Sequence, residues 1–128
     1  MEVVAFVGPS GTGKSHRALS VAHDNKSEAI IDDGLLIKGT KILAGSSAKS
    51  EQNRIQAVKR AIFSDQDHVD EVKKAIADAQ IEKLLVIGTS VNMALKICAR
   101  LGLPKPVKFV KIQDIASKHE INRARQIR

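Results

Sequence analysis

Aromatic residues are nearly absent from this sequence of 128 residues, which has three Phe and neither Trp nor Tyr. We therefore expect an aliphatic core and a surface poorly suited to stacking nucleic-acid bases. Cysteine is also rare: Cys98 stands alone, so an internal disulfide is excluded and a reducing compartment is favoured. Nothing near Cys98 indicates a reactive thiol, and we expect it to pack within a helix.

Long apolar runs are missing as well. No stretch approaches the roughly 20 apolar residues that a membrane span needs, and the N-terminus lacks the basic flank of a signal peptide. We therefore expect a cytoplasmic protein without a membrane partner. Four histidines show no metal-ligand spacing with the cysteine, and we expect them at the surface: His16, His23, His68 and His119.

The charge is distributed unevenly along the chain. The net charge is +7, yet residues 1–37 carry three basic and five acidic side chains, whereas the remainder carries eighteen basic and nine acidic ones. Such a basic remainder suits a polyanionic ligand, either nucleotide phosphates or nucleic acid. Solvated helix faces explain the same residues equally well, so nucleic acid is left open as a partner.

Predicted strands and helices alternate, and the length fits a single domain over residues 1–128. This alternation predicts a three-layer α/β/α fold with a parallel sheet of about four strands, in the order 2-3-1-4. Glycine, serine and lysine predict a mobile loop over residues 38–50. A helical pattern from Ser117 still continues at Arg128, which leaves open a longer protein. The strands are expected at 2–7, 29–31, 83–87 and 107–110, and the helices at 14–23, 51–63, 64–80, 91–101 and from 117.

The segment Gly8–Ser15 carries the clearest chemistry. It reads Gly-Pro-Ser-Gly-Thr-Gly-Lys-Ser, fits G-x-x-x-x-G-K-[ST] at every fixed position, and joins a buried type of strand to a helix. Its glycines let successive N–H groups face one centre, and the helix N-terminus adds the positive end of its dipole. Lys14 would reach the β- and γ-phosphates, and the Ser15 hydroxyl would bind Mg²⁺. We expect nucleotide contacts from Gly8, Pro9, Ser10, Gly11, Thr12, Gly13, Lys14, Ser15 and His16.

This segment resembles the Walker A motif of the P-loop NTPase superfamily, and the order of the predicted elements resembles that superfamily over most of the chain. The resemblance implies a P-loop NTPase fold and the binding of ATP with Mg²⁺, but no particular reaction. The chain has no N/T-K-x-D segment, which disfavours a GTPase.

An acidic pair, Asp32-Asp33, ends the second predicted strand, whereas the third ends in Gly88-Thr89-Ser90 without an acid. In this layout the chain resembles small-molecule and nucleoside kinases, the group that includes shikimate, gluconate and adenylate kinases. The resemblance implies catalytic roles for Lys14, Asp32 and Asp33, with one aspartate serving the metal or the phosphoryl acceptor. It also implies that Ser15 and Asp32 hold Mg²⁺. A plain acidic turn is the alternative.

Three basic groups are candidates for the lid arginines of such kinases, which stabilise charge on the transferring phosphoryl group. A solvated surface is the alternative for each of them, and a helix N-cap is the alternative for a binding role of Thr89 or Ser90. The candidates are Lys41 and Lys49; Arg54, Lys59 and Arg60; and Arg123, Arg125 and Arg128. We expect the loop over residues 38–50 to close over a bound triphosphate, with a surface loop that never meets the ligand as the alternative.

The sequence thus predicts an ATP-binding protein that transfers phosphate to a small-molecule acceptor or hydrolyses ATP. The alternative is a nucleotide-responsive binding or switch module, associated with nucleic acid and without turnover. Neither the acceptor nor the oligomeric state is indicated.

Overall fold

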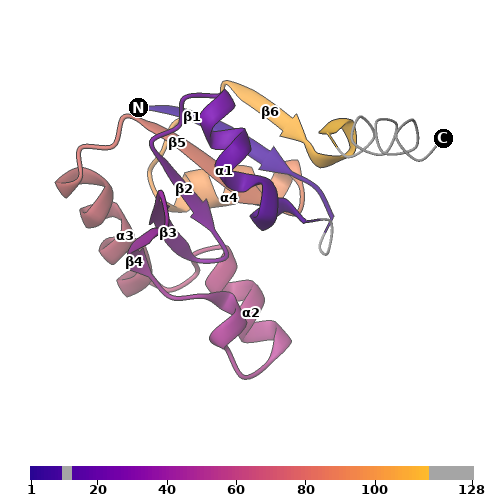
Figure 1. Ribbon diagram of the computed structural model, residues 1–128. Helices are drawn as coiled ribbons and strands as arrows, with labels where there is room; N and C mark the ends of the chain where they lie inside the picture. Colours follow the sequence, from indigo (N-terminus) through magenta and orange to yellow (C-terminus); the bar gives the residue numbers. More distant parts are fainter. Residues whose placement is uncertain (10–12, 116–128) are drawn as a thin grey trace.

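The computed structural model describes residues 1–9 and 13–115. A mixed sheet of six strands forms its centre, in the order β4-β3-β2-β5-β1-β6, and helices flank it (Figure 1). In chain order the elements are β1 (Glu2–Val7), α1 (Lys14–Asp24), β2 (Ala29–Asp32), β3 (Leu35–Lys38), β4 (Lys41–Gly45), the 3-10 helix η1 (Ala48–Ser50), α2 (Arg54–Ala61), α3 (Gln66–Asp78), β5 (Lys83–Gly88), α4 (Val91–Arg100) and β6 (Lys108–Lys111).

Four of the strands are parallel neighbours, in the order β2-β5-β1-β6. This is the order predicted for the four strands found in the sequence. It brings the carboxyl ends of β1, β2 and β5 to one edge of the sheet, where β1 runs into the Gly8–Ser15 segment and β2 ends at Asp32.

The prediction of a purely parallel sheet of about four strands is wrong, because β3 and β4 extend β2 as antiparallel strands. Asp33 and Gly34, with φ values of 55° and 87°, form the tight turn from β2 into β3. Two consecutive left-handed residues are typical of a two-residue hairpin turn, for which Asp-Gly is a preferred sequence. The expected mobile loop over 38–50 is therefore largely hairpin, and Gly39, with φ 62°, turns β3 into β4.

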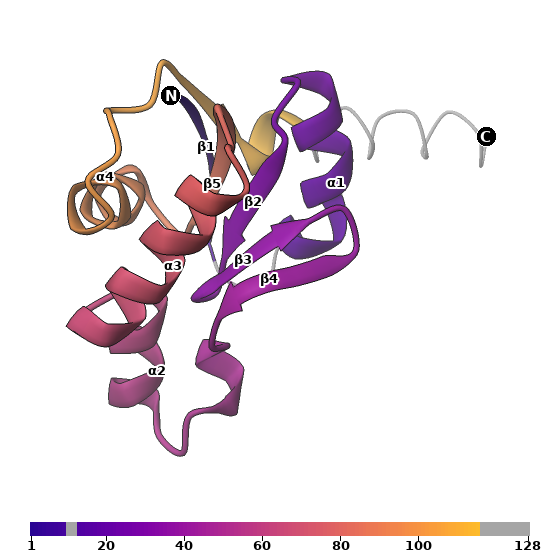
Figure 2. The same cartoon turned by 90° about the vertical axis from the view of Figure 1, so that its left-hand side faces the viewer.

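Helices cover both faces of the sheet (Figure 2). Side chains of β1 alternate between the faces, so that Val3 and Ala5 pack in the core cluster that includes residues of α3 and α4, whereas Val4 and Phe6 pack in the cluster that includes residues of α1. Cys98 lies buried in α4, as predicted, and burial raises the pKa of its thiol to about 11.

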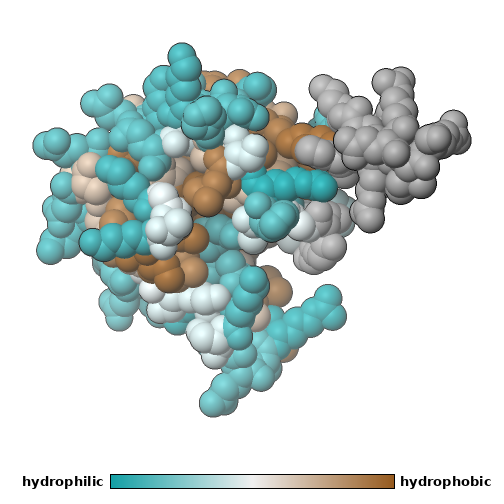
Figure 3. Space-filling model, viewed as in Figure 1, coloured by the Kyte–Doolittle hydropathy of each residue, from teal (hydrophilic) through white to brown (hydrophobic). Residues whose placement is uncertain are grey.

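The helix α2 is shorter than predicted, and it packs against η1 rather than against the sheet. The Asn53 side chain caps its N-terminus by accepting from the Gln56 amide, and Arg60 donates to Glu51 over 3.1 Å. Its apolar side chains Ile55 and Val58 are 69% and 54% exposed. In Figure 1 this helix lies below the sheet. Figure 3 shows hydrophilic side chains projecting from this part of the surface.

None of the helices formed by the described residues is long and apolar enough to cross a membrane. The helix predicted from Ser117 lies outside the described residues, as do His119 and the basic residues Arg123, Arg125 and Arg128.

Candidate functional site

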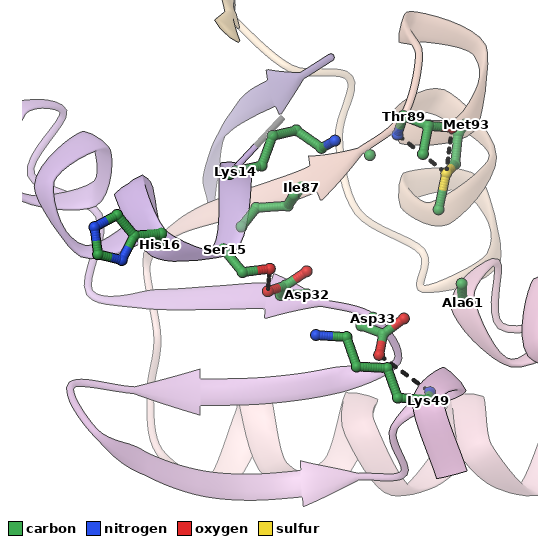
Figure 4. Close-up of a pocket in the computed structure, with 12 residues that line it drawn as sticks. Lys14, Ser15, His16, Asp32, Asp33, Lys49, Ala61, Ile87, Thr89 and Met93 are labelled. Carbon is green, nitrogen blue, oxygen red and sulfur yellow. Dashed lines mark hydrogen bonds between the residues drawn. The ribbon is translucent and has the colours of Figure 1, made fainter. Parts of the chain in front are cut away.

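A cavity of about 360 Å³ opens at the carboxyl edge of the parallel strands. Five parts of the chain line it: the start of α1, the end of β2, η1, the end of α2, and the junction of β5 with α4. Figure 4 shows how these side chains surround it. The lining residues are Gly13, Lys14, Ser15, His16, Asp32, Asp33, Lys49, Ala61, Ile87, Gly88, Thr89 and Met93.

Two glycines shape the described ends of the Gly8–Ser15 segment, and each is required for a different reason. Gly8 is buried, and a Cβ atom at this position would overlap the side chain of Ile112. Gly13 has φ 82° and precedes α1 as its N-cap residue, a left-handed conformation that costs a non-glycine residue about 1 kcal/mol or more. The first turn of α1 carries no acidic residue, so no carboxylate there offsets the positive end of the helix dipole. Ser10, Gly11 and Thr12 lie outside the described residues.

The Lys14 side chain folds back onto the start of this segment. Its ammonium group donates to the carbonyl oxygens of Gly8 at 2.6 Å and Pro9 at 2.8 Å. Partial burial lowers the pKa of Lys14 below its ordinary value, and the nearby negative charge of Asp32 opposes that shift. A cation thus lies at the N-terminus of α1, the end at which anions are favoured.

Asp32 meets Ser15 at the centre of the cavity. The Ser15 hydroxyl donates to the Asp32 carboxylate over 2.7 Å, and so joins the first turn of α1 to the end of β2 across the edge of β5 (Figure 4). A hydroxyl and a carboxylate are hard oxygen ligands of the kind that Mg²⁺ prefers. Among the described residues no group of three or more His, Cys, Asp or Glu side chains lies together.

Asp33, the other residue of the acidic pair, is directed to a different partner. Its carboxylate accepts from the Ser47 hydroxyl at 2.8 Å and from the Lys49 amide at 3.3 Å, and its carbonyl oxygen accepts from the Ala48 amide at 2.9 Å. The structure therefore places Asp32 beside Ser15, whereas Asp33 connects η1 to the turn after β2.

The junction of β5 and α4 contributes Ile87, Gly88, Thr89 and Met93 to the cavity wall. Ser90 is the N-cap of α4 and accepts from the Met93 amide at 3.1 Å, which confirms the alternative of a capping role for this segment. The Thr89 amide and hydroxyl both lie 3.2 Å from the Met93 sulfur. Of the basic candidates in the described part, Lys49 lines the cavity, whereas Lys41, Arg54, Lys59 and Arg60 do not.

The prediction that all four histidines lie at the surface is wrong for His68, which is 3% exposed. Its Nε2 lies 2.7 Å from the carbonyl oxygen of Gly34, and its ring stacks on Phe63 with 4.3 Å between the ring centres. A carbonyl oxygen only accepts, so Nε2 carries the hydrogen. His68 thus supports the turn after β2 through its contact with Gly34. His16 is exposed, as predicted, and is among the residues that line the cavity.

Sequence reasoning missed Ala61, Ile87 and Met93 as cavity residues. Ile87 and Met93 could have been found from their place at and just after the end of the third predicted strand, because the carboxyl ends of neighbouring parallel strands meet at one edge of the sheet. Comparisons with protein-family models, with curated proteins and with solved structures found no match for this chain.

Proposed function

We propose that this protein binds a nucleoside triphosphate, ATP in the first instance, together with Mg²⁺ in the cavity at the start of α1. The observation that carries the proposal is the hydrogen bond of Ser15 to Asp32, placed directly after a G-x-x-x-x-G-K-S sequence that joins a buried strand to a helix. The Gly8–Ser15 segment then acts as a P-loop.

In this proposal the phosphates occupy the N-terminus of α1. The free N–H groups of the first turn and the positive end of the helix dipole attract them, and the Lys14 ammonium exchanges its carbonyl partners for phosphate oxygens. The exchange is favourable because a hydrogen bond between two ionised groups is stronger than one to a neutral carbonyl.

The metal is assigned to Ser15 and Asp32. The Ser15 hydroxyl binds Mg²⁺ directly, and the Asp32 carboxylate binds either the ion or a water molecule in its shell. Phosphate oxygens and water complete the six ligands, which agrees with the reluctance of Mg²⁺ to give up all its water.

Phosphoryl transfer to a small acceptor is a second candidate function, and the extent of the cavity favours it. Thr89, Met93 and Ala61 also line the cavity, and in this proposal they surround the place of the acceptor. The predicted alternative, a nucleotide-responsive module without turnover, needs no such place. Release of ADP from Mg-ATP, measured alone, with hydroxylated metabolites and with nucleic acid, distinguishes these functions.

Thermal unfolding tests the binding proposal. A ligand present at 100 times its Kd adds about 2.7 kcal/mol to the free energy of unfolding. We expect Mg-ATP to raise Tm by several degrees, and ATP with a chelator or Mg²⁺ alone to raise it much less. Equal midpoints with and without saturating Mg-ATP would refute the proposal.

A further inference from the structure

The 3-10 helix η1 is held beside the end of β2 by several hydrogen bonds to Asp33. Asp33 accepts from the Ser47 hydroxyl and the Lys49 amide through its carboxylate, and from the Ala48 amide through its carbonyl oxygen. Because Asp33 directly follows Asp32 in the chain, η1 is held in register with the carboxylate assigned to Mg²⁺.

With η1 held in this way, the Lys49 side chain extends into the cavity. Figure 4 shows its side chain extending from η1 past Asp33 toward Asp32, on the side of the cavity opposite Lys14. Within residues 1–9 and 13–115, no ion pair or side-chain hydrogen bond holds its ammonium group. This charge is therefore free to meet an anion in the cavity.

The position of the metal determines which phosphate Lys49 would meet. A metal held by Ser15 and Asp32 would neutralise charge on the β- and γ-phosphates, and in this inference the γ-phosphate is assigned to the Asp32 side of the cavity. Lys14, at the opposite wall, serves both phosphates. Lys49 approaches from the Asp32 side and would meet the terminal phosphate without contacting the α- or β-phosphate.

We propose that Lys49 contacts the γ-phosphate and gives this site its preference for a triphosphate over a diphosphate, and that Asp33 is the positioning residue that holds Lys49 there. This inference rests on the proposed function and adds a residue that reads the length of the phosphate chain. The two neighbouring aspartates then have different roles. Asp32 binds the metal, and Asp33 holds the segment that carries Lys49.

The experiment compares Kd values for Mg-ATP and Mg-ADP, measured by calorimetry on the full chain. We expect Lys49→Ala to weaken Mg-ATP about tenfold and to leave Mg-ADP nearly unchanged, because an exposed charge-assisted contact is lost only with the triphosphate. Lys41→Ala is the matched control, an exposed lysine of β4 that does not line the cavity, and it should change neither affinity. Lys49→Arg should keep most of the preference.

The positioning role is tested in the same assay. Ser47→Ala removes a hydrogen bond to Asp33 and also the N-cap of η1, since the Ser47 hydroxyl accepts from the Lys49 amide, and it should lower the ATP-to-ADP preference in part. Asp33→Ala should lower it as far as Lys49→Ala does, and the double variant Asp33→Ala/Lys49→Ala should lose no more than either single variant. If Asp33→Ala does not fold, Asp33→Gly decides, because glycine also lacks the carboxylate and adopts the φ of 55° without strain.

The outcomes separate the inference from the proposed function. If the wild type binds neither nucleotide, the proposed function fails and the inference fails with it. If the wild type binds Mg-ATP more tightly than Mg-ADP and Lys49→Ala keeps the same ratio, the inference alone is overturned. An equal loss of both nucleotides in Lys49→Ala contradicts it as well, because it indicates a general electrostatic effect rather than a contact to the γ-phosphate.

Discussion

The hydroxyl of Ser15 lies 2.7 Å from the carboxylate of Asp32, although β1, the strand before α1, and β2 are separated in the sheet by β5. The first turn of α1 supplies the hydroxyl and the end of β2 supplies the carboxylate. Two oxygen ligands thus meet beside the N-terminus of a helix, where a phosphate would supply the remaining charge for a divalent cation.

This pair predicts how magnesium dependence changes on substitution. Ser15→Ala and Asp32→Asn should each reduce the gain in ATP affinity that Mg²⁺ provides by about tenfold, because each removes one oxygen or one charge from the ion. The measurement is the Kd for ATP with Mg²⁺ and with a chelator. Ser20→Ala, at an exposed position of α1, is the control. If the variants and the wild type gain equally from Mg²⁺, the metal does not lie at Ser15 and Asp32.

Affinity for ATP should also depend on pH through Lys14. Burial lowers the pKa of this ammonium below its ordinary value of 10.5, so the free protein loses the charge at a lower pH than an exposed lysine would. The terminal phosphate is already ionised above a pKa of about 6. Affinity should therefore fall as pH rises toward 10.5. Lys14→Arg keeps its charge at position 14 throughout, so its affinity should fall less over this range than that of the wild type. Parallel profiles for the two proteins would contradict the role of Lys14.

The packing of Gly8 against Ile112 predicts a coupled pair. Gly8→Ala should lower the free energy of unfolding by about 1–3 kcal/mol, because the added methyl group overlaps the Ile112 side chain. Ile112→Ala alone should also destabilise the protein by leaving a cavity. Together the two changes should cost less than the sum of the single costs, which denaturant unfolding measures. Strict additivity would show that Gly8 does not need this close approach.

The buried contact of His68 with Gly34 should contribute to the free energy of unfolding, although His68 does not line the cavity. His68→Leu should lower the free energy of unfolding by about 1–3 kcal/mol, because the carbonyl oxygen of buried Gly34 loses its donor. His23→Leu is the control, since the His23 side chain is 92% exposed. Chemical denaturation of both variants checks the prediction, and equal midpoints would show that the hydrogen bond from His68 contributes nothing.

The parallel part of the fold could be predicted from the sequence because local patterns determine it. Apolar runs such as Glu2–Val7 and Lys83–Gly88 are typical of strands buried on both faces, and helices with clear apolar periodicity separate them. The Gly8–Ser15 segment could be placed for the same reason, since its motif stands between a strand and a helix.

The hairpin β3–β4 was missed because its strands are short and its apolar residues are not all buried. Ile42 is 58% exposed, and Figure 3 shows apolar side chains over this hairpin. The signal that could have revealed it is Asp33-Gly34, a preferred two-residue turn that was interpreted only as an acidic end to a strand. The separate partners of Asp32 and Asp33 depend on this turn, so they could not be assigned without it.

His68 was misplaced because histidine was treated as a surface residue by type. Its spacing indicated otherwise: Val72 and Ile76 follow it at four and eight residues, on the same face of α3, and both are buried. The place of Lys49 in the cavity has no such local signal. It results from side-chain contacts between Asp33 and a segment fourteen residues further along the chain.

The most direct test of the account is a calorimetric titration of the protein with Mg-ATP, beside Lys14→Ala and the control Lys96→Ala, an exposed position of α4. We predict saturable binding of one nucleotide per chain to the wild type and to Lys96→Ala. Lys14→Ala should bind about 10-fold to 100-fold more weakly, since a hydrogen bond to a charged group contributes about 1.5–3 kcal/mol. Equal affinities for Lys14→Ala and the wild type, or no saturable binding to the wild type, would contradict the claim that Gly8–Ser15 binds the phosphates.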